Sequence, residues 1–315
     1  PGYLLVRRLG RGGFGEVWQA VKPSGFEVAL KVIPLYGDAA VFELRALELL
    51  KHIRHPHLLA TFDALQFGDV LIIEMELAER TLYQRYLEVA DQGHSGIPFQ
   101  ELIGYLQEAA EGVDYLNVGQ MEKGRPAIQH RDLKPQNLLL LGGRVKVADF
   151  GLAKALERSR GSHTGAMTTA YAPPEAFRGE TKPQSDQYSL ALTYFELRKG
   201  QHVFHAYLAS AELIRNAHLH IPPDLSSLPR AESAVVARAL AKDASERWPS
   251  CCQMVERLRE AQGPDLAITS AEFALPQSAS PVVGKQIEAL LPWLQLPSEA
   301  RTILSRLISL VKCGN

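Results

Sequence analysis

The chain has 315 residues, of which 46% are hydrophobic and 22% charged, and its formal net charge at pH 7 is −1. This balance is typical of a globular protein and excludes the broad basic surface that binds nucleic acid or anionic membranes. Its three cysteines, two of them adjacent, have neither a disulfide nor a metal-ligand spacing, which predicts reduced thiols and a cytoplasmic location.

No stretch of the sequence approaches 18 consecutive apolar residues, so no transmembrane helix is predicted. The sequence starts with Pro1 inside an apolar run, and we interpret it as a piece of a longer protein. A membrane tether in segments outside this sequence therefore stays open.

The first motif is a glycine-rich turn, G-R-G-G-F-G-E-V at residues 10–17. Glycines let backbone N–H groups approach a phosphate without a side chain in the way. The same spacing opens a helix in dinucleotide-binding folds, but here the apolar run 4–6 leads into the turn and strand-like residues 17–21 follow it, with a third strand predicted at 26–33. Two strands around the turn favour a flap over phosphates. The candidate phosphate-binding residues are Gly10, Gly12 and Gly15.

The strand at 26–33 carries Lys31 in an otherwise apolar run. A lysine is costly to bury unless an anion meets it, so either it has a partner or it faces solvent on an edge strand. Residues 38–53 have apolar side chains every three positions, which predicts a helix. That helix offers Glu43 and Glu48, and we favour Glu43 because its neighbour four positions on is apolar, whereas that of Glu48 is polar.

An antiparallel pair of strands is predicted at 61–66 and 70–75, with a turn between them. The second strand runs into a connector, where we expect backbone groups of Glu76 and Ala78 to meet an adenine edge. From there the periodicity becomes helical, with a broad apolar stripe along residues 99–116.

The most informative stretch is residues 129–140, which reads Q-H-R-D-L-K-P-Q-N-L-L-L. Phosphoryl transfer from ATP needs a carboxylate for the hydroxyl proton, a cation on the moving phosphoryl group and an oxygen ligand for magnesium. Asp132, Lys134 and Asn137 supply one each, just ahead of a predicted buried strand. The alternative, a surface turn of mixed charge, does not account for the match along the whole stretch.

A short hairpin over residues 138–148 then leads into Asp149, followed by Phe150 and Gly151. If the hairpin forms, this second acid lies near Asn137. Two oxygen ligands together with triphosphate oxygens are a set that Mg²⁺ accepts. We therefore expect Asn137 and Asp149 to bind the metal ion.

In this order and spacing, the motifs resemble those of eukaryotic-like (Hanks-type) serine/threonine protein kinases, of the kind found in bacteria, over roughly residues 4–258. The resemblance implies an α+β bilobal protein-kinase fold. A small antiparallel β-sheet lobe with one helix would span residues 1–77, and a larger, mainly helical lobe residues 78–262. A linker and an amphipathic helical tail would form residues 263–315.

The resemblance also implies roles for individual residues and a need for ATP and Mg²⁺, with Mn²⁺ as an alternative ion. Asp132 would accept the hydroxyl proton and Lys134 would neutralise the γ-phosphoryl group. Lys31 would hold the α- and β-phosphates and pair with Glu43. Asn137 and Asp149 would ligate the metal, and Met75 would be the gatekeeper residue. The implied nucleotide-binding residues are Leu9, Gly10, Gly12, Gly15, Val17, Ala29, Lys31, Met75, Glu76 and Ala78.

Residues 149–175 resemble an activation segment that ends in A-P-P-E, where the family normally reads A-P-E. Thr168 aligns with the threonine that contacts the catalytic acid and lysine. Glu175 would pair with Arg247 in a buried ion pair. Asp186 would take an N-cap-like position at a helix start and steady the catalytic loop.

Arg131 beside Asp132 is typical of kinases whose activation segment carries a phosphate. Ser159, Ser162 and Thr164 lie in a polar run of that segment, and we expect autophosphorylation there, at Thr164 first, with a homodimer as one route. The alternative is a solvated serine-rich loop.

Residues 266–283 read as an irregular linker, and residues 298–313 as an amphipathic helix that needs a partner. That helix would dock on the large lobe, form a dimer contact or begin a regulatory domain. Two other functions remain open. A pseudokinase scaffold would lack one of the key acids or the lysine, and a small-molecule kinase would not need the A-P-P-E segment. We expect protein substrates with Ser or Thr acceptors.

Overall fold

The computed structural model describes residues 2–12, 15–35, 53–119, 127–150 and 169–262. Contacts group residues 1–263 into one compact unit. Most of the predicted helix at 38–53, and with it Glu43 and Glu48, lies outside the described residues. The same holds for Thr168, for the three candidate phosphorylation sites and for the tail from residue 263 onward.

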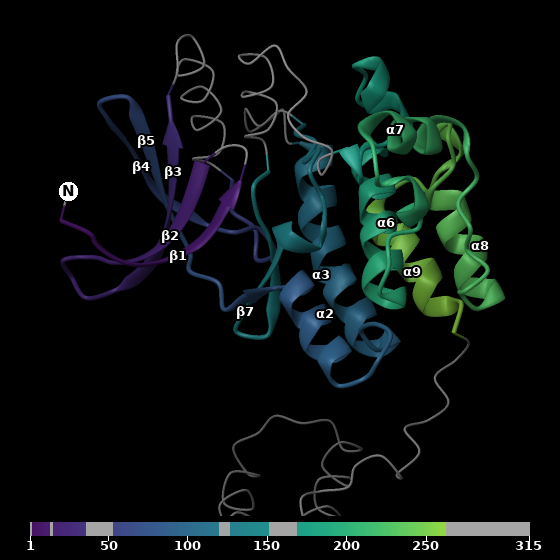
Figure 1. Cartoon of the computed structure of the whole chain (residues 1–315), viewed down its shortest axis with the longest axis horizontal. Helices are drawn as coiled ribbons and strands as arrows, with labels where there is room; N and C mark the ends of the chain where they lie inside the picture. Colours follow the sequence, from purple (N-terminus) through teal and green to yellow (C-terminus); the bar gives the residue numbers. More distant parts are fainter. Residues whose placement is uncertain (1, 13–14, 36–52, 120–126, 151–168, 263–315) are drawn as a thin grey trace, which may run out of the picture. The chain divides into compact units, whose positions relative to one another are not determined.

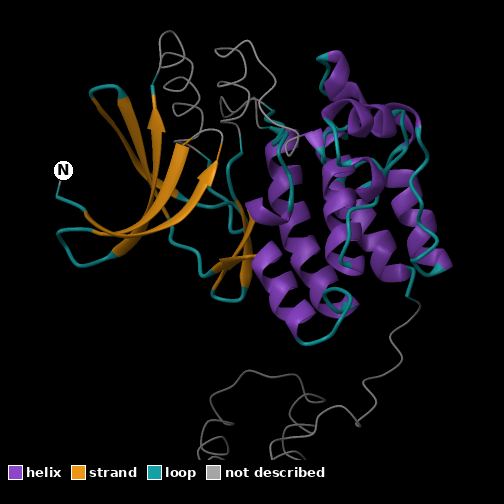
Figure 2. Ribbon diagram, viewed as in Figure 1, coloured by secondary structure: helices purple, strands orange, loops and turns teal. Residues whose placement is uncertain are grey.

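The small lobe is a five-stranded sheet in which every neighbouring pair of strands is antiparallel, as predicted (Figures 1 and 2). The strand order is β1-β2-β3-β5-β4, so β3 is the central strand and Lys31 does not lie on an edge. The strands are β1 (Leu4–Gly12), β2 (Gly15–Val21), β3 (Glu27–Pro34), β4 (Thr61–Phe67) and β5 (Val70–Met75).

One face of this sheet forms the core of the small lobe. Side chains alternate along a strand, so Leu71, Ile73 and Met75 of β5 point to the same side, and all three are buried. In the register between β3 and β5, Ala29 pairs with Met75 and Lys31 with Ile73. Lys31 therefore belongs to the inner face, and its side chain is almost entirely enclosed.

The larger lobe is mainly helical, with a three-stranded sheet, β6-β7-β8, on the side of the small lobe (Figure 2). The predicted hairpin at 138–148 is present as β7 and β8. The helices are α2 (Leu82–Asp91), α3 (Phe99–Val118), α6 (Ser185–Lys199), α7 (Ala211–His220), α8 (Arg230–Ala239) and α9 (Cys251–Glu260). The short strands are β6 (Arg80–Thr81), β7 (Leu138–Leu141) and β8 (Arg144–Val147). The 3-10 turns are η2 (Pro135–Asn137), η3 (Pro174–Arg178), η4 (His205–Tyr207) and η5 (Ala244–Glu246).

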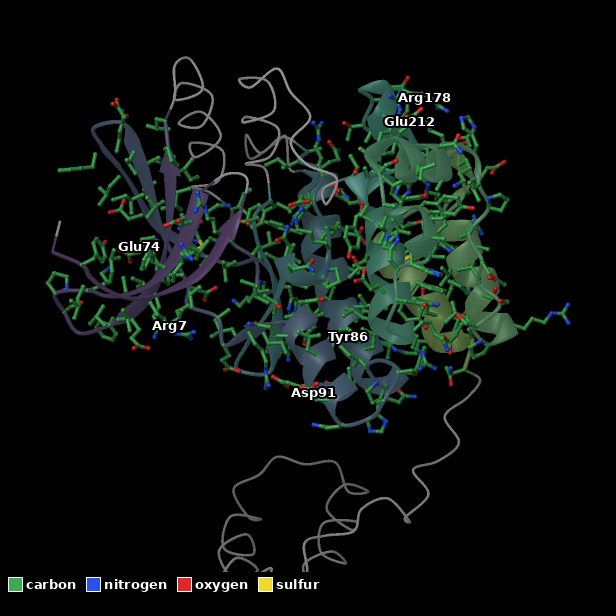
Figure 3. All side chains as sticks on the ribbon, viewed as in Figure 1. Arg7, Glu74, Tyr86, Asp91, Arg178 and Glu212 are labelled. Carbon is green, nitrogen blue, oxygen red and sulfur yellow. The ribbon has the colours of Figure 1, made fainter. Side chains whose placement is uncertain are left out.

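Helix α6 is the central helix of the large lobe, because all but three of its fifteen residues are buried (Figure 1). Helix α3 packs on it through the apolar stripe predicted at 99–116. Helix α2 is tied to the end of α6 by Tyr86, whose hydroxyl donates to the Gly200 carbonyl at 3.0 Å (Figure 3). No helix in the described part of the chain is long and apolar enough to cross a bilayer.

Two backbone connections between the lobes lie within the described residues. The chain passes from β5 to β6 through residues 76–79, which contain the predicted lobe boundary at residue 77. In addition, the loop before β4 is fastened to β8: the Val147 amide donates to the His57 carbonyl, and the Leu59 amide to the Val147 carbonyl, both at 2.9 Å. The His57 ring donates from Nδ1 to the Val145 carbonyl at 3.1 Å. These bonds hold β8, and the segment that follows it, against the small lobe.

Candidate active site

The catalytic loop is held from below by a buried carboxylate on α6. Asp186 accepts hydrogen bonds from the backbone amides of His130 at 2.8 Å and Arg131 at 2.9 Å. Arg131 has a φ of 69°, a left-handed conformation that is uncommon outside glycine and that surrounding bonds must sustain. The prediction that Asp186 steadies the catalytic loop is confirmed.

The predicted N-cap position of Asp186 was wrong. Helix α6 begins at Ser185, with Gln184 at the N-cap, so Asp186 is inside the first turn. The physical reason is that both of its carboxylate oxygens serve the amides of the loop rather than the free amides of its own helix.

Asp132, Lys134 and Asn137 form one cluster. The Lys134 ammonium lies 2.8 Å from Asp132 Oδ2. The Asn137 amide nitrogen donates to the same Oδ2 at 2.9 Å and to the Asp132 carbonyl at 2.7 Å. The three residues that the sequence singled out therefore lie together, with the Asp132 carboxylate oriented by a cation and an amide.

Asp149 reaches this cluster because the β7–β8 hairpin brings it beside Asn137. The amide of Ala148 donates to the Asn137 carbonyl at 2.9 Å, and the ring of His130 bonds to the Ala148 carbonyl at 2.8 Å. Asp149 itself has a φ of 62°, so the hairpin ends in a second left-handed residue. The metal ligands that we predicted thus come from adjoining segments.

The side chain of Lys31 crosses from the small lobe to Asp149, with its ammonium 2.6 Å from Oδ1. Burial by itself raises the pKa of Asp149, but the charge and hydrogen bond of Lys31 outweigh it. His130 and Lys134 add smaller effects, so the pKa lies below its usual value. Asp149 is thus held as a carboxylate, and 37% of its side chain remains exposed to a ligand.

Lys31 was predicted to pair with Glu43, and that residue lies outside the described part of the chain. Within the part that is described, the ion pair of Lys31 is with Asp149. The Glu43 pairing, and the choice between it and Glu48, remain predictions. A lysine that contacts a metal-ligating acid is in place to meet the phosphates that the metal would bind.

The structure requires glycine at only one of the three predicted flap positions, Gly10, Gly12 and Gly15. A Cβ atom added at Gly10 or Gly12 would meet nothing within 4 Å, so packing does not demand glycine there. Gly15 has a φ of 136°, and its Cβ would lie 2.1 Å from the Val32 carbonyl oxygen of β3. Gly15 is therefore needed for the pairing of β2 with β3, whereas open space over the other two is compatible with a bound phosphate.

The connector after β5 is partly occupied by its own hydrogen bonds. The Glu76 amide donates to the Ala60 carbonyl at 3.0 Å, and its carboxylate accepts from the Ala60 amide at 2.9 Å and lies 3.4 Å from the Lys146 ammonium. The predicted adenine contact therefore cannot use the Glu76 amide. Among the described residues, the Glu76 carbonyl and the Ala78 amide make no hydrogen bond, so these two groups are open to a base edge.

The remaining predicted nucleotide-binding side chains line the same region. Val17 packs against the main core, and Met75 ends β5 with 8% of its surface exposed. Ala29 pairs with Met75 across the sheet, while Leu9 lies on β1 and is 38% exposed. These positions are on the flap strands and on the strand that enters the connector.

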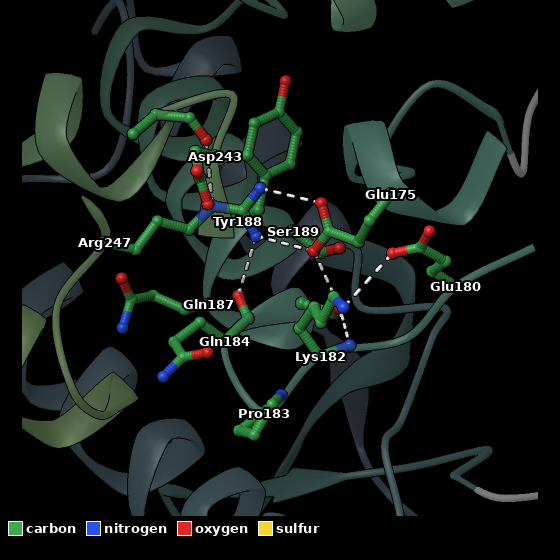
Figure 4. Close-up of polar contacts among 12 residues, drawn as sticks. Glu175, Glu180, Lys182, Pro183, Gln184, Gln187, Tyr188, Ser189, Asp243 and Arg247 are labelled. Carbon is green, nitrogen blue, oxygen red and sulfur yellow. Dashed lines mark hydrogen bonds and ion pairs between the residues drawn. The ribbon is translucent and has the colours of Figure 1, made fainter. Parts of the chain in front are cut away.

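Glu175 and Arg247 form the predicted buried ion pair (Figure 4). Two hydrogen bonds of 2.8 Å join them, and both side chains are almost fully enclosed. Ser185 donates to Glu175 at 2.7 Å, and Arg247 also donates to the Gln184 carbonyl at 3.1 Å. Burial alone would raise the pKa of Glu175, but the contacts with Arg247 and Ser185 lower it by more than burial raises it. The pKa is therefore below its usual value, and the carboxylate is charged.

Sequence reasoning did not single out Tyr171, although it lies beside the site. Its hydroxyl donates to Glu196 of α6, and its carbonyl accepts from Ser189 at 2.8 Å. Burial first, and then the charge of Glu196, raise its pKa, with the charge of Asp132 among the smaller causes. Its place two positions before the A-P-P-E proline was the signal in the sequence.

The donor set fits magnesium. Asn137 and Asp149 offer an amide and a carboxylate, which are hard oxygen ligands, and Mg²⁺ usually takes one or two such groups plus substrate phosphates. No group of three or more His, Cys, Asp or Glu residues in the described ranges could hold a metal ion alone.

A two-lobed fold with these acids, lysines and glycines at the junction defines a protein kinase domain. In agreement, the family model described as protein kinase domain matches residues 3–258, and the chain belongs to that family.

Curated relatives carry the same description. The serine/threonine-protein kinase PknJ of Mycobacterium tuberculosis (strain ATCC 25618 / H37Rv) is 31% identical, over 96% of this chain and 52% of its own length. PknF of the same strain is 30% identical, over 82% of the chain and 56% of its own length. The probable serine/threonine-protein kinase PknB of Lactococcus lactis subsp. lactis (strain IL1403) is 30% identical, over 80% of the chain and 41% of its own length. The chain spans about half the length of these relatives.

Proposed function

We propose that the chain is a serine/threonine protein kinase that transfers the γ-phosphoryl group of Mg-ATP to hydroxyl groups of protein substrates. The observation that carries the proposal is the convergence of Asp132, Lys134 and Asn137 with Asp149, whose carboxylate is bonded to Lys31. The names of the relatives support serine and threonine as acceptors.

In this proposal Asp132 orients the acceptor hydroxyl and takes its proton while the new oxygen–phosphorus bond forms and the bond to the leaving phosphate oxygen breaks. Lys134, 2.8 Å from Asp132, neutralises the oxygens of the moving phosphoryl group. Lys31 binds the phosphates that remain with the nucleotide. Asn137 and Asp149 hold Mg²⁺ or Mn²⁺, and the chemistry that the ion supplies is neutralisation and alignment of the phosphate oxygens.

The adenine edge would meet the Glu76 carbonyl and the Ala78 amide, which are open in the described part of the connector. Gly10 and Gly12 would let backbone amides approach the phosphates, because no side chain fills the space above them. Most of the rate enhancement would then come from positioning and charge stabilisation.

The decisive experiment is a transfer assay with radiolabelled ATP, Mg²⁺ and mixed histones as acceptor. Asp132→Asn removes the proton acceptor but keeps the shape of the side chain, so we expect transfer to fall by about 100-fold or more, in line with loss of a general base. Asp91→Asn, at the end of α2, is the control and keeps full activity. Transfer that is indifferent to Asp132→Asn contradicts the assignment.

The alternative of a pseudokinase scaffold predicts nucleotide binding without transfer. Lys31, Asp132 and Asp149 are all present and in contact with partners that suit catalysis, which favours turnover. A small-molecule kinase would phosphorylate a sugar or amine and ignore histones. The Glu175–Arg247 pair, which stabilises the segment before α6, supports a platform for a protein acceptor.

We further propose regulation by autophosphorylation at Thr164, Ser159 or Ser162, within a transient homodimer. The support is the position of Arg131 next to Asp132 and the polar sequence of residues 158–165. A cytoplasmic location of the catalytic domain fits the free thiols of Cys251 and Cys252. Mass spectrometry after incubation with ATP tests the regulation: an active preparation without phosphate in residues 155–168 contradicts it.

A further inference from the structure

A histidine on α7 holds the chain next to the acceptor side of the site. His218 is fully buried, and its Nε2 lies 3.0 Å from the carbonyl oxygen of Ala170. Its Nδ1 lies 3.0 Å from the hydroxyl of Tyr188 on α6. A carbonyl only accepts hydrogen bonds, so Nε2 carries the hydrogen and Nδ1 accepts from the Tyr188 hydroxyl. The bonds form a directed chain from Tyr188 through His218 to Ala170.

These two hydrogen bonds require a neutral imidazole at His218, and the surroundings of His218 keep the ring neutral. Burial lowers the pKa of His218 to about 3, and repulsion by Lys242, and by His202 when that ring is protonated, lowers it as well. His202 stands beside it with ring centroids 6.4 Å apart and packs edge-on against Tyr171 at 5.3 Å. At neutral pH both hydrogen bonds of His218 are therefore present.

The residue held by His218 is directly before Tyr171. The helix residue that binds the Tyr171 carbonyl, Ser189, stands three positions after Asp186, which holds the amides of the catalytic loop. The neighbouring Tyr171 carbonyl is bound by Ser189 of α6 at 2.8 Å. Two successive carbonyls, those of Ala170 and Tyr171, thus accept hydrogen bonds from the side chains of His218 and Ser189 rather than from backbone amides of a helix or sheet. The segment 169–172 is therefore held by α6 and α7, and the same turn of α6 holds the His130 and Arg131 amides just before Asp132.

Tyr188, which donates to His218, also contacts the Glu175–Arg247 ion pair. The guanidinium of Arg247 lies over the ring of Tyr188, 4.9 Å from its centroid, while it binds Glu175 on the other side. Tyr188 therefore links the support under Ala170 with the support under Glu175. None of these contacts involves Lys31, Asn137 or Asp149, which bind the nucleotide side.

We propose that His218 is a positioning residue for the protein substrate, which acts by holding the Ala170 carbonyl and so placing residues 169–172 beside Asp132. This inference rests on the proposed kinase function. A water molecule is small enough to reach Asp132 without contacting residues 169–172. In this proposal a protein acceptor at Asp132 contacts that segment. Loss of the His218 bond should therefore weaken acceptor binding and leave nucleotide binding and ATP hydrolysis in place.

The test compares three variants with a control on the same helix. His218→Leu removes the donor, His218→Gln keeps an N–H near the position of Nε2, and Tyr188→Phe removes only the hydroxyl that donates to Nδ1. His220→Gln changes an exposed histidine of α7. For each we measure KM for mixed histones, KM for ATP, and ATP hydrolysis without acceptor.

We expect His218→Leu to raise KM for histones about tenfold, since a buried carbonyl loses its donor, with KM for ATP and hydrolysis within twofold. His218→Gln restores most of the loss, Tyr188→Phe has a smaller effect of the same sign, and His220→Gln has none. Equal losses in histone transfer and in ATP hydrolysis, or an unchanged KM for histones, overturn the proposal. If His218→Leu does not fold, the other two variants decide.

Hydrogen exchange separates this inference from the proposed function. The amides of residues 171 and 172 should exchange faster in His218→Leu than in the parent chain and the His220→Gln control, whether or not any acceptor is phosphorylated. Unchanged exchange refutes the role of His218. Absence of transfer by the parent chain refutes the kinase proposal instead.

Discussion

The ammonium of Lys31 lies 2.6 Å from a carboxylate oxygen of Asp149, although the two residues are 118 positions apart. One stands on the central strand of the small lobe and the other at the end of the β7–β8 hairpin. This bond joins the residues that we propose bind the phosphates and the metal ion, and it lowers the pKa of Asp149.

Lys31→Met should therefore change the pH dependence of nucleotide binding. Without the lysine, burial dominates and raises the pKa of Asp149. We expect the affinity for Mg-ATP to fall at neutral pH and to begin its decline at a higher pH than in the parent chain. Calorimetric titrations from pH 5 to pH 8 measure this. Lys182→Met, a half-exposed lysine paired with Glu180, is the control, and an unchanged profile for Lys31→Met would contradict the coupling.

Asp186→Asn should lower catalysis more than nucleotide binding. The charged carboxylate accepts from two loop amides, and its loss lets Asp132 move from its place. We expect kcat to fall by about 10- to 100-fold with KM for ATP within twofold. The matched control is Asp114→Asn: Asp114 binds the amides of Cys251 and Cys252 at 2.9 and 2.8 Å in the same way, but at the start of α9 and not in the catalytic loop. Both variants lose stability, but a drop in kcat for the control as well would refute the explanation.

Gly15→Ala and Gly12→Ala should separate stability from binding. The added methyl at Gly15 would lie 2.1 Å from the Val32 carbonyl oxygen, so we expect a loss of about 1–3 kcal/mol in the free energy of unfolding. Gly12→Ala meets no atom and should keep its stability while KM for ATP rises. Urea unfolding and steady-state kinetics test the pair, and the reverse pattern would show that the flap packs differently.

The Glu175–Arg247 pair should contribute strongly to stability. Arg247→Leu leaves a buried carboxylate without its cation, which costs about 3–5 kcal/mol. The pKa of Glu175 is lowered in the folded chain, so its contribution is present above the ordinary carboxyl range and is lost as pH falls through the lower value. Urea unfolding at neutral and acid pH measures both effects. Arg257→Leu, at an exposed pair with Glu260, should cost at most about 0.5 kcal/mol.

Two buried histidines should make the fold sensitive to acid. Burial lowers the pKa of His202 to about 4 and that of His218 to about 3. In the unfolded chain these groups take up protons from about pH 6.5 downward, so the unfolded state binds more protons and stability falls as pH drops below that value. Unfolding free energies between pH 7 and pH 4 measure the slope. His218→Gln should reduce it, whereas the exposed His220→Gln should leave it unchanged.

Much of the fold could be predicted from local sequence. The alternation along residues 70–75, the stripe along 99–116 and the hairpin at 138–148 each have a signature within a few residues, and all are present. The same holds for Asp132, Lys134 and Asn137, because chemistry at one loop requires them close together in the chain. The prediction of an N-cap position for Asp186 was wrong, because its carboxylate accepts hydrogen bonds from a loop more than fifty positions away.

By itself, the sequence determined the kinase family and the two-lobed arrangement of strands and helices. It also singled out the acid, lysine and amide that the structure brings into one cluster. Only the tertiary structure decided that Lys31 binds Asp149, that Gly15 is required by β3, and that His218 holds the Ala170 carbonyl. The reason is physical: periodicity and turn chemistry depend on neighbours along the chain. Buried ion pairs and hydrogen bonds depend on which distant segments packing brings within 3 Å.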